Sequence, residues 1–85
     1  MNELRVLGVY ISDRLDAVQL VQKTLTKFGC SIKTRLGLNK VVDDSCSNSG
    51  LILLELTGDL NEALKLENEL LKIDGVQVEK MVFRT

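Results

Sequence analysis

"SDRLDAVQLVQKTLTKFG", residues 12–29, and "GDLNEALKLENELLKIDG", residues 58–75, are two stretches of equal length that each predict an amphipathic helix. Each has an aspartate in the N-cap position, Asp13 or Asp59. Each ends at a glycine, Gly29 or Gly75, of the kind that terminates a helix in the left-handed conformation. Between these ends apolar residues recur every three or four positions, so both helices are predicted to bury one face.

The match between the two stretches continues into the segments that flank them. An offset of 46 residues places Asp13 on Asp59, and it also places Val6 on Ile52 and Ile32 on Val78. Agreement of caps, stops and flanking apolar residues in one register favours a doubled β-α-β unit. Residues 1–85 are then predicted to form a single α+β domain with a ferredoxin-like βαββαβ fold, a four-stranded antiparallel sheet with two helices on one face.

The predicted strands differ in how apolar they are. The first and third, Leu4 to Ile11 and Leu51 to Leu56, carry apolar residues on both faces and are expected in the centre of the sheet. The second and fourth, Ile32 to Leu38 and Val76 to Phe83, mix apolar with charged residues, as edge strands often do. If the helices cover one face, the other exposes several hundred Å² of apolar surface. We therefore expect a homodimer or tetramer formed through the helix-free face.

Composition excludes several classes of function. The 85 residues contain 11 Lys and Arg, 12 Asp and Glu and no histidine, a net charge of -1 that gives no signature for binding nucleic acid alone or a membrane. Without histidine the commonest general base and most zinc sites are lost, so the sequence predicts no enzyme, metal or cofactor. Cys30 and Cys46 are expected to be ordinary thiols. With no signal peptide or spanning segment, the expected location is the cytoplasm.

Two candidates for ligand binding lie where the first strand leads into the first helix, Asp13 and Arg14. An arginine in this position could hold a phosphate, as acylphosphatases do in the same loop. A solvated arginine at the start of a helix is the commoner arrangement. A ligand in this region would be held at a subunit interface near the strand-helix loop.

The other two candidates, Arg35 and Gly37, interrupt the second predicted strand, "IKTRLGLN" over residues 32–39. Strict alternation places Lys33, Arg35, Gly37 and Asn39 on the face away from the helices. There Lys33 and Arg35 could protect an edge strand from aggregation, and Gly37 could form a bulge where the strand bends into the loop. Alternatively, Arg35 lies at the rim of a subunit interface and pairs with an acid of the next copy, or with a carboxylate or phosphate ligand beside Gly37.

Five segments resemble one family: "SDR" before the first helix, "IKTRLGL" as the second strand, "GLILLELTGD", "IDGVQVEKMVF" and the short first strand. The sequence is similar to the stand-alone regulators of the iron-only hydrogenase system, small ACT-like proteins related in fold to the C-terminal domain of nickel-responsive repressors. The resemblance implies an ACT-like fold, a symmetric oligomer and a role in regulating hydrogen metabolism. It does not imply nickel sensing, since the chain has no histidine and has Gly50 where the repressors place a cysteine.

Two functions from different classes remain open. One is a regulatory module that binds a small ligand or a protein, with a protein of hydrogenase maturation or regulation as a partner. The other is an assembly or interaction protein that needs no small ligand. An ACT-type amino-acid sensor is a further alternative, which the absence of glycine from "SDRLDA" weakens.

Overall fold

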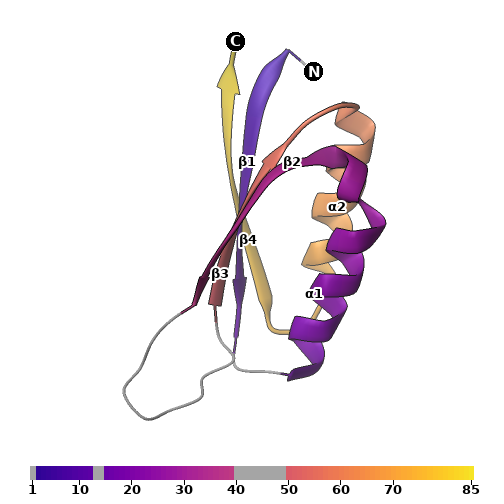
Figure 1. The fold of residues 1–85 in the computed structure, drawn as a ribbon, viewed down its shortest axis with the longest axis vertical. Coiled ribbons are helices and arrows are strands. Elements are labelled where there is room, and N and C mark those ends of the chain that lie inside the picture. Colours follow the sequence, from indigo (N-terminus) through magenta and orange to yellow (C-terminus); the bar gives the residue numbers. More distant parts are fainter. Residues whose placement is uncertain (1, 13–14, 40–49) are drawn as a thin grey trace.

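Each half of the chain forms a β-α-β unit, and the strands of the two units join into one antiparallel sheet (Figure 1). The structure, a computed structural model, describes residues 2–12, 15–39 and 50–85. The elements in chain order are β1 (Glu3–Ile11), α1 (Leu15–Lys27), the short 3-10 helix η1 (Gly29–Ser31), β2 (Ile32–Asn39), β3 (Gly50–Leu56), α2 (Leu60–Leu71) and β4 (Val76–Arg84). The strand order is β2-β3-β1-β4. The predicted ferredoxin-like βαββαβ fold, with its first and third strands in the centre, is confirmed.

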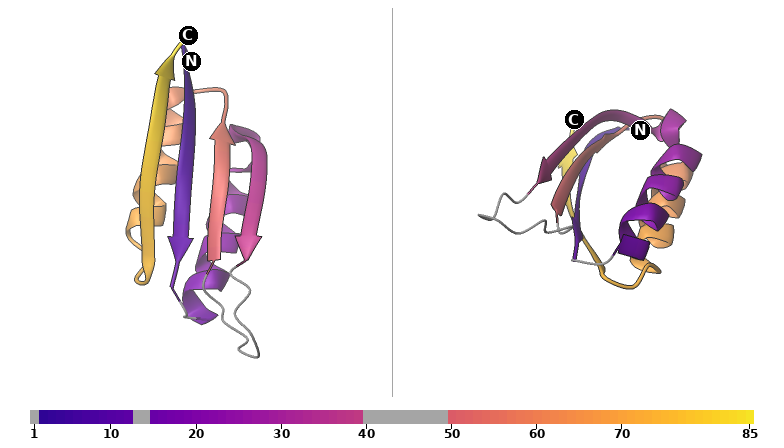
Figure 2. Two further views of the ribbon diagram at one scale, coloured as in Figure 1. Left: turned by 90° about the vertical axis from the view of Figure 1, so that its left-hand side faces the viewer. Right: turned by 60° about the horizontal axis from the view of Figure 1, so that its bottom comes forward.

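Both helices cover the same face of the sheet (Figure 2). Alternate residues of β1 and β3 point to this face and pack against one stripe of each helix, because successive side chains of a strand point to opposite sides. The core they form consists of Leu7, Val9, Ile11, Ile52, Leu54 and Leu56 from the strands, Ala17, Val21, Leu25, Ala63, Leu66 and Leu70 from the helices, and Phe28. Neither described helix is long and apolar enough to cross a membrane.

The second helix begins where the sequence predicts and is followed by a left-handed glycine. The side chain of Asp59 caps α2 by accepting a hydrogen bond from the backbone N–H of Asn61 at 2.9 Å. After α2, Gly75 adopts a φ of 85°, in the left-handed region that glycine tolerates best. The predicted left-handed conformation of Gly75 is therefore confirmed, but α2 ends earlier than predicted, with Lys72 as its C-cap, and Gly75 lies in the turn before β4.

The first helix ends differently, and the prediction of a left-handed Gly29 is wrong. After α1 the chain tightens into η1, in which the backbone N–H of Ser31 donates to the carbonyl of Phe28 at 2.9 Å. Gly29 is the first residue of this turn and keeps an ordinary φ. Equal spacing in the sequence thus conceals two different helix ends. The predicted N-cap of α1, Asp13, lies outside the described residues.

A bulge near the start of β2 overturns the predicted faces of this strand. Ile32 lies opposite Leu56 of β3, and Thr34 lies opposite Glu55, the residue before Leu56 in the chain. Two steps along β2 thus correspond to one step along β3, so Lys33 is an inserted residue. An inserted residue reverses the alternation that follows it. From Thr34 to Gly37, each residue therefore lies on the face opposite the one predicted. The bulge is at Lys33 and not at Gly37.

Candidate functional site

The structure separates the four predicted ligand-binding residues into two pairs. Asp13 and Arg14 lie outside the described residues, so their role stays a prediction. Arg35 and Gly37 share one face of β2 at alternate positions, opposite Leu54 and Ile52 of β3. Both of these β3 residues are buried beneath the helices, so Arg35 and Gly37 lie on the helix side of the sheet. The predicted placement on the helix-free face is wrong for both, because of the bulge at Lys33.

Arg35 reaches toward the first helix. Its guanidinium donates a hydrogen bond to the side-chain oxygen of Gln22 on α1, in an exposed contact. A Cβ added to Gly37 would meet no atom within 4 Å, so the space beside Arg35 is open. The side chain of Arg35 therefore lies on the helix side of the edge strand β2, opposite the face through which an interface is predicted.

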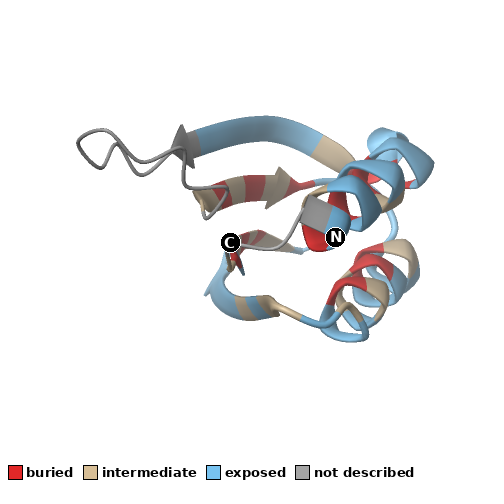
Figure 3. Ribbon diagram, turned by 90° about the horizontal axis from the view of Figure 1, so that it is seen from below, coloured by how far each residue is buried: buried red, intermediate tan, exposed pale blue. Residues whose placement is uncertain are grey.

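The helix-free face, called the open face below, is largely apolar. The register of the four strands places on it Leu4, Val6, Gly8 and Tyr10 of β1, Leu36 of β2, Leu51 and Leu53 of β3, and Met81 and Phe83 of β4. Four of these side chains are strongly exposed: Tyr10 at 41%, Leu36 at 52%, Met81 at 53% and Phe83 at 51%. The bulge in β2 enlarges the face, since it turns Leu36 away from the helices. Figure 3 shows β2 exposed along most of its length beside the alternating burial of β3.

On the helix side, a cluster of charges lies between β1, β4 and α2, partly buried and open to solvent at Lys80. At its centre is Arg5, which is 7% exposed. Its Nη2 and Nε donate to Glu3 Oε1 at 2.9 and 3.1 Å, and its Nη1 lies 3.5 Å from Glu67 Oε1. Glu67 Oε2 in turn accepts from Lys80 Nζ at 3.4 Å. These ion pairs fix α2 against both strands, and each charge in the cluster has an opposite charge beside it.

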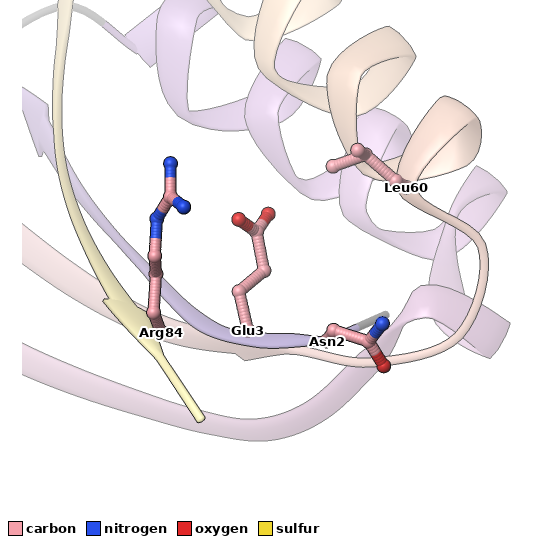
Figure 4. A pocket seen from close by; sticks show the side chains of 4 residues that line it. All are labelled: Asn2, Glu3, Leu60 and Arg84. Carbon is pink, nitrogen blue, oxygen red and sulfur yellow. The ribbon is translucent and has the colours of Figure 1, made fainter.

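A cavity of about 260 Å³ lies beside this cluster, where β1 begins and β4 ends (Figure 4). Its lining residues are Asn2, Glu3, Leu60 and Arg84. Glu3 and Arg84 are cross-strand neighbours, and Leu60 is the first residue of α2. Within the described part of the chain the side chain of Arg84 has no ion pair or hydrogen bond, whereas the carboxylate of Glu3 is bound to Arg5. Arg84 is exposed, so its guanidinium is solvated, next to the half-exposed side chain of Leu60.

Metal chemistry finds no support in residues 2–12, 15–39 and 50–85, which contain no group of three or more acidic, cysteine or histidine residues able to hold an ion. Cys30 is an exposed free thiol in η1. Cys46 lies outside the described residues.

Comparison with known proteins identifies the fold. No family model matches the chain, and no curated protein matches it in sequence. An uncharacterized protein from Thermotoga maritima has a similar structure, with a TM-score of 0.80 and 27% identity over 94% of this chain and 96% of that one. The ACT domain of the GTP pyrophosphokinase from Chlorobium tepidum is similar in its crystal structure, with a TM-score of 0.67 and 19% identity over 92% of this chain and 96% of that one. Its solution structure gives a TM-score of 0.64, also at 19% identity, over 95% and 89%. The fold is therefore ACT-like.

Sequence reasoning missed the charged cluster and the cavity. Arg5 is in phase with Leu7, Val9 and Ile11, so the alternation that predicts a buried stripe also predicts a buried arginine at its end. That signal was available in the sequence. The partner Glu67 and the cavity residue Arg84 carry no such signal, because their environment depends on pairing between segments far apart in the chain.

Proposed function

We propose that this protein is a small regulatory module that acts as a homo-oligomer, with protomers stacked through the open face. One observation carries the proposal: four large apolar side chains, each more than two-fifths exposed, lie on the same face of the sheet. Monomeric proteins rarely leave so extensive an apolar patch in water. A second copy of the same face is the simplest cover, because a two-fold axis matches apolar surface with itself.

The size of the open face suits a dimer. Strands of seven to nine residues form the sheet. At ~4.8 Å between strands and ~3.4 Å per residue, the face measures roughly 19 by 27 Å, or about 500 Å². Stacking two copies then buries on the order of 1,000 Å², the lower limit for a specific interface.

Two acids lie on the open face, Glu55 of β3 and Glu79 of β4, which is opposite Gly8. The first is compensated within its own protomer. Glu55, the acid that lies beside the apolar residues of β3, accepts a hydrogen bond from Thr34 Oγ1 at 3.0 Å. Lys33, the inserted residue of the bulge, places its Nζ 3.8 Å from the other oxygen of Glu55. Because Glu55 is already compensated within the protomer, covering it costs less than burying an isolated carboxylate.

The regulatory part of the proposal rests on the ACT-like fold together with the sequence resemblance to regulators of the iron-only hydrogenase system. We propose that system as the one regulated, through binding of a small ligand or of a hydrogenase protein. This part can be tested by deleting the gene in its host and measuring hydrogenase activity and transcript levels. Unchanged activity and transcript levels would refute a role in regulating hydrogenase. A thermal-shift screen with amino acids, nucleotides and metal ions separates a ligand-responsive module from an assembly protein that needs no ligand.

Sedimentation velocity tests the oligomer directly. The wild-type protein should sediment as a dimer or larger species at micromolar concentration. Leu53→Glu places a charge in the middle of the open face and should yield a folded monomer. Leu64→Glu is the matched control, since Leu64 is an exposed leucine on α2, 38% accessible, and should leave the assembly intact. A wild-type monomer, or equal dissociation by both variants, would overturn the proposal.

A further inference from the structure

β4 forms one edge of the sheet and pairs with β1 alone (Figure 2). Two hydrogen bonds fix the direction of its backbone groups: Ser12 N–H donates to the carbonyl of Gly75 at 2.8 Å, and Thr85 N–H donates to that of Asn2 at 3.5 Å. In an antiparallel pair, residues that exchange hydrogen bonds alternate with residues whose backbone groups point away from the partner. Odd-numbered residues of β4 are therefore bonded to β1, and even-numbered residues direct their N–H and C=O groups outward.

Two common protections of an exposed strand, a bulge and a proline, are absent from this edge. β4 pairs with β1 in unbroken register along its whole length, and the sequence contains no proline. The opposite edge strand, β2, is interrupted by the bulge at Lys33. Among the described residues, the outward backbone groups of Val78, Lys80, Val82 and Arg84 have no hydrogen-bond partner. The edge of β4 can therefore bond a further strand.

Exposed apolar side chains lie beside this edge. Beyond the open face, the strongly exposed large apolar side chains of the described residues are Leu20 of α1, Leu60, Leu64 and Leu71 of α2, and Val82 of β4. The three leucines of α2 share one stripe of the helix with Glu67, whose ion pair with Lys80 turns that stripe toward β4. Val82 points to the same helix side of the sheet. The outer edge of β4 and these four apolar residues are called the β4 side below.

The charges of β4 disfavour a second copy of the chain as the added strand. Two β4 strands that pair antiparallel bond through their outward groups, so even-numbered residues lie opposite even-numbered residues. Glu79 is odd-numbered, whereas Lys80 and Arg84 are even-numbered, so no such register brings opposite charges together. A register centred on Lys80 opposes two lysines, and one centred on Glu79 opposes two acids, which destabilises the pairing. The edge is thus protected against its own sequence.

A strand of a different sequence can match these charges. An antiparallel strand can place an acid opposite Arg84 and, five residues further along, a base opposite Glu79. Opposite charges directly across two strands stabilise a sheet. The base would also compensate an acid that lies on the open face beside Gly8 and forms no ion pair within the described part of the chain. Apolar residues between the two charges would pack against Phe83 on one face and Val82 on the other.

We infer that the β4 side binds an extended segment of a partner protein, which joins the sheet as a fifth strand antiparallel to β4. Backbone hydrogen bonds to the outward groups supply affinity, and alternate side chains supply specificity. Side chains of the segment that face the helix side pack against Leu60, Leu64 and Leu71. The segment is recognised by an acid, a run of apolar residues and a base five positions after the acid. This surface gives the proposed regulatory module a kind of partner and rests on the proposed function only for the consequence of binding.

A designed peptide tests the surface on the ¹⁵N-labelled full chain. The peptide Thr-Glu-Val-Val-Ile-Thr-Lys-Val-Thr has its acid and base at the required spacing, and nuclear magnetic resonance follows its titration. Saturable shifts and slowed hydrogen exchange are expected at the outward amides of Val78, Lys80, Val82 and Arg84. Slow exchange of these amides in the protein alone would mean that another copy already covers the edge, and would overturn the inference.

Modified peptides test the hydrogen bonds and the charges separately. The amides of the fourth and sixth peptide residues, opposite Val82 and Lys80, point toward β4, so N-methylation of both should abolish binding. The amides of the fifth and seventh residues point away, so N-methylation there should leave binding nearly unchanged. Exchanging the glutamate and lysine of the peptide places like charges opposite Arg84 and Glu79 and should weaken binding about tenfold. Equal binding by the two methylated peptides, or by the original and charge-exchanged peptides, would contradict the proposed strand.

Protein variants locate the binding surface and separate it from the stacking interface. Leu64→Glu should weaken peptide binding about tenfold, because it removes apolar contact on the β4 side. Leu20→Glu is the matched control, since Leu20 is an exposed leucine on α1. Leu53→Glu should break the stack yet retain peptide binding, so failure of the oligomer and failure of this surface are distinguishable. Absence of saturable shifts, or equal affinity in wild type and Leu64→Glu, overturns the inference.

Discussion

Arg5 of β1 and Glu67 of α2 face each other in the interior, with Arg5 Nη1 3.5 Å from Glu67 Oε1. Neither atom makes a hydrogen bond within the described part of the protein. Each side chain instead forms its hydrogen bonds elsewhere, Arg5 with Glu3 and Glu67 with Lys80. The attraction between the two charges therefore links α2 to β1, and it adds to the compensation that Glu3 gives Arg5 and Lys80 gives Glu67.

Removing one member of this pair should destabilise the fold. Glu67→Ala removes one of the two acids beside Arg5, which is nearly buried, so we expect a loss of about 2 kcal/mol in the free energy of unfolding. Urea denaturation followed by circular dichroism measures it. Glu62→Ala is the control, since Glu62 forms only an exposed pair with Lys65 and should change stability by less than about 1 kcal/mol. Equal losses would show that the cluster contributes no more than a surface ion pair.

The two glycines that follow the helices should respond oppositely to alanine. Gly75 has a φ of 85°, which a residue with a Cβ adopts at a cost of about 1 kcal/mol, equivalent to roughly 4–8 °C in Tm. Gly29 has an ordinary φ, and a Cβ there meets no atom within 4 Å. Gly29→Ala should therefore leave Tm unchanged or raise it slightly, because alanine restricts the unfolded chain. Thermal unfolding of both variants checks this, and a loss for Gly29→Ala would contradict the 3-10 conformation of η1.

Local patterns predicted the parts of the fold that depend on local interactions. Alternation along β1 and β3 gave their central position, and the cap at Asp59 and the left-handed conformation of Gly75 follow from short-range backbone chemistry. The bulge at Lys33 could not be predicted in this way, because it is defined by the pairing of β2 with β3 and nothing in "IKTRLGLN" marks the inserted residue. One misplaced residue then reversed the predicted face of both Arg35 and Gly37.

The candidate site shows the same division between local and long-range information. Burial of Arg5 is readable from the strand pattern, since it occupies the next inward position before Leu7. The ion pair with Glu67 and the cavity beside Arg84 need segments from both ends of the chain to meet, through the pairing of β1 with β4 and the packing of α2. A single sequence does not define these contacts.

Arg35→Gln tests the corrected position of β2. Arg35 is exposed on the helix side and contacts Gln22, so its replacement should change the free energy of unfolding by no more than about 0.5 kcal/mol. The oligomeric state should not change either, because the side chain points away from the open face. Urea denaturation and sedimentation velocity measure the two quantities. A weakened assembly would contradict the placement and restore Arg35 to the rim of the interface.

Adjacent residues of β4 provide the sharpest test of which face is covered. Phe83 and Val82 are both substantially exposed in the protomer, at 51% and 42%, but they point to opposite sides of the sheet. Threonine keeps strand propensity at either position while removing apolar surface, so the two replacements should disturb the fold of the protomer to a similar, small extent. Stacking through the open face would bury Phe83 in each copy, and about 100 Å² of apolar surface corresponds to roughly 2.5 kcal/mol at each site.

Phe83→Thr should therefore raise the dissociation constant of the oligomer at least tenfold, whereas Val82→Thr should leave it unchanged. A dilution series analysed by sedimentation equilibrium, with circular dichroism to confirm folding, measures both constants. Equal weakening by the two variants, or none by Phe83→Thr, would show that the open face is not the surface through which the copies associate.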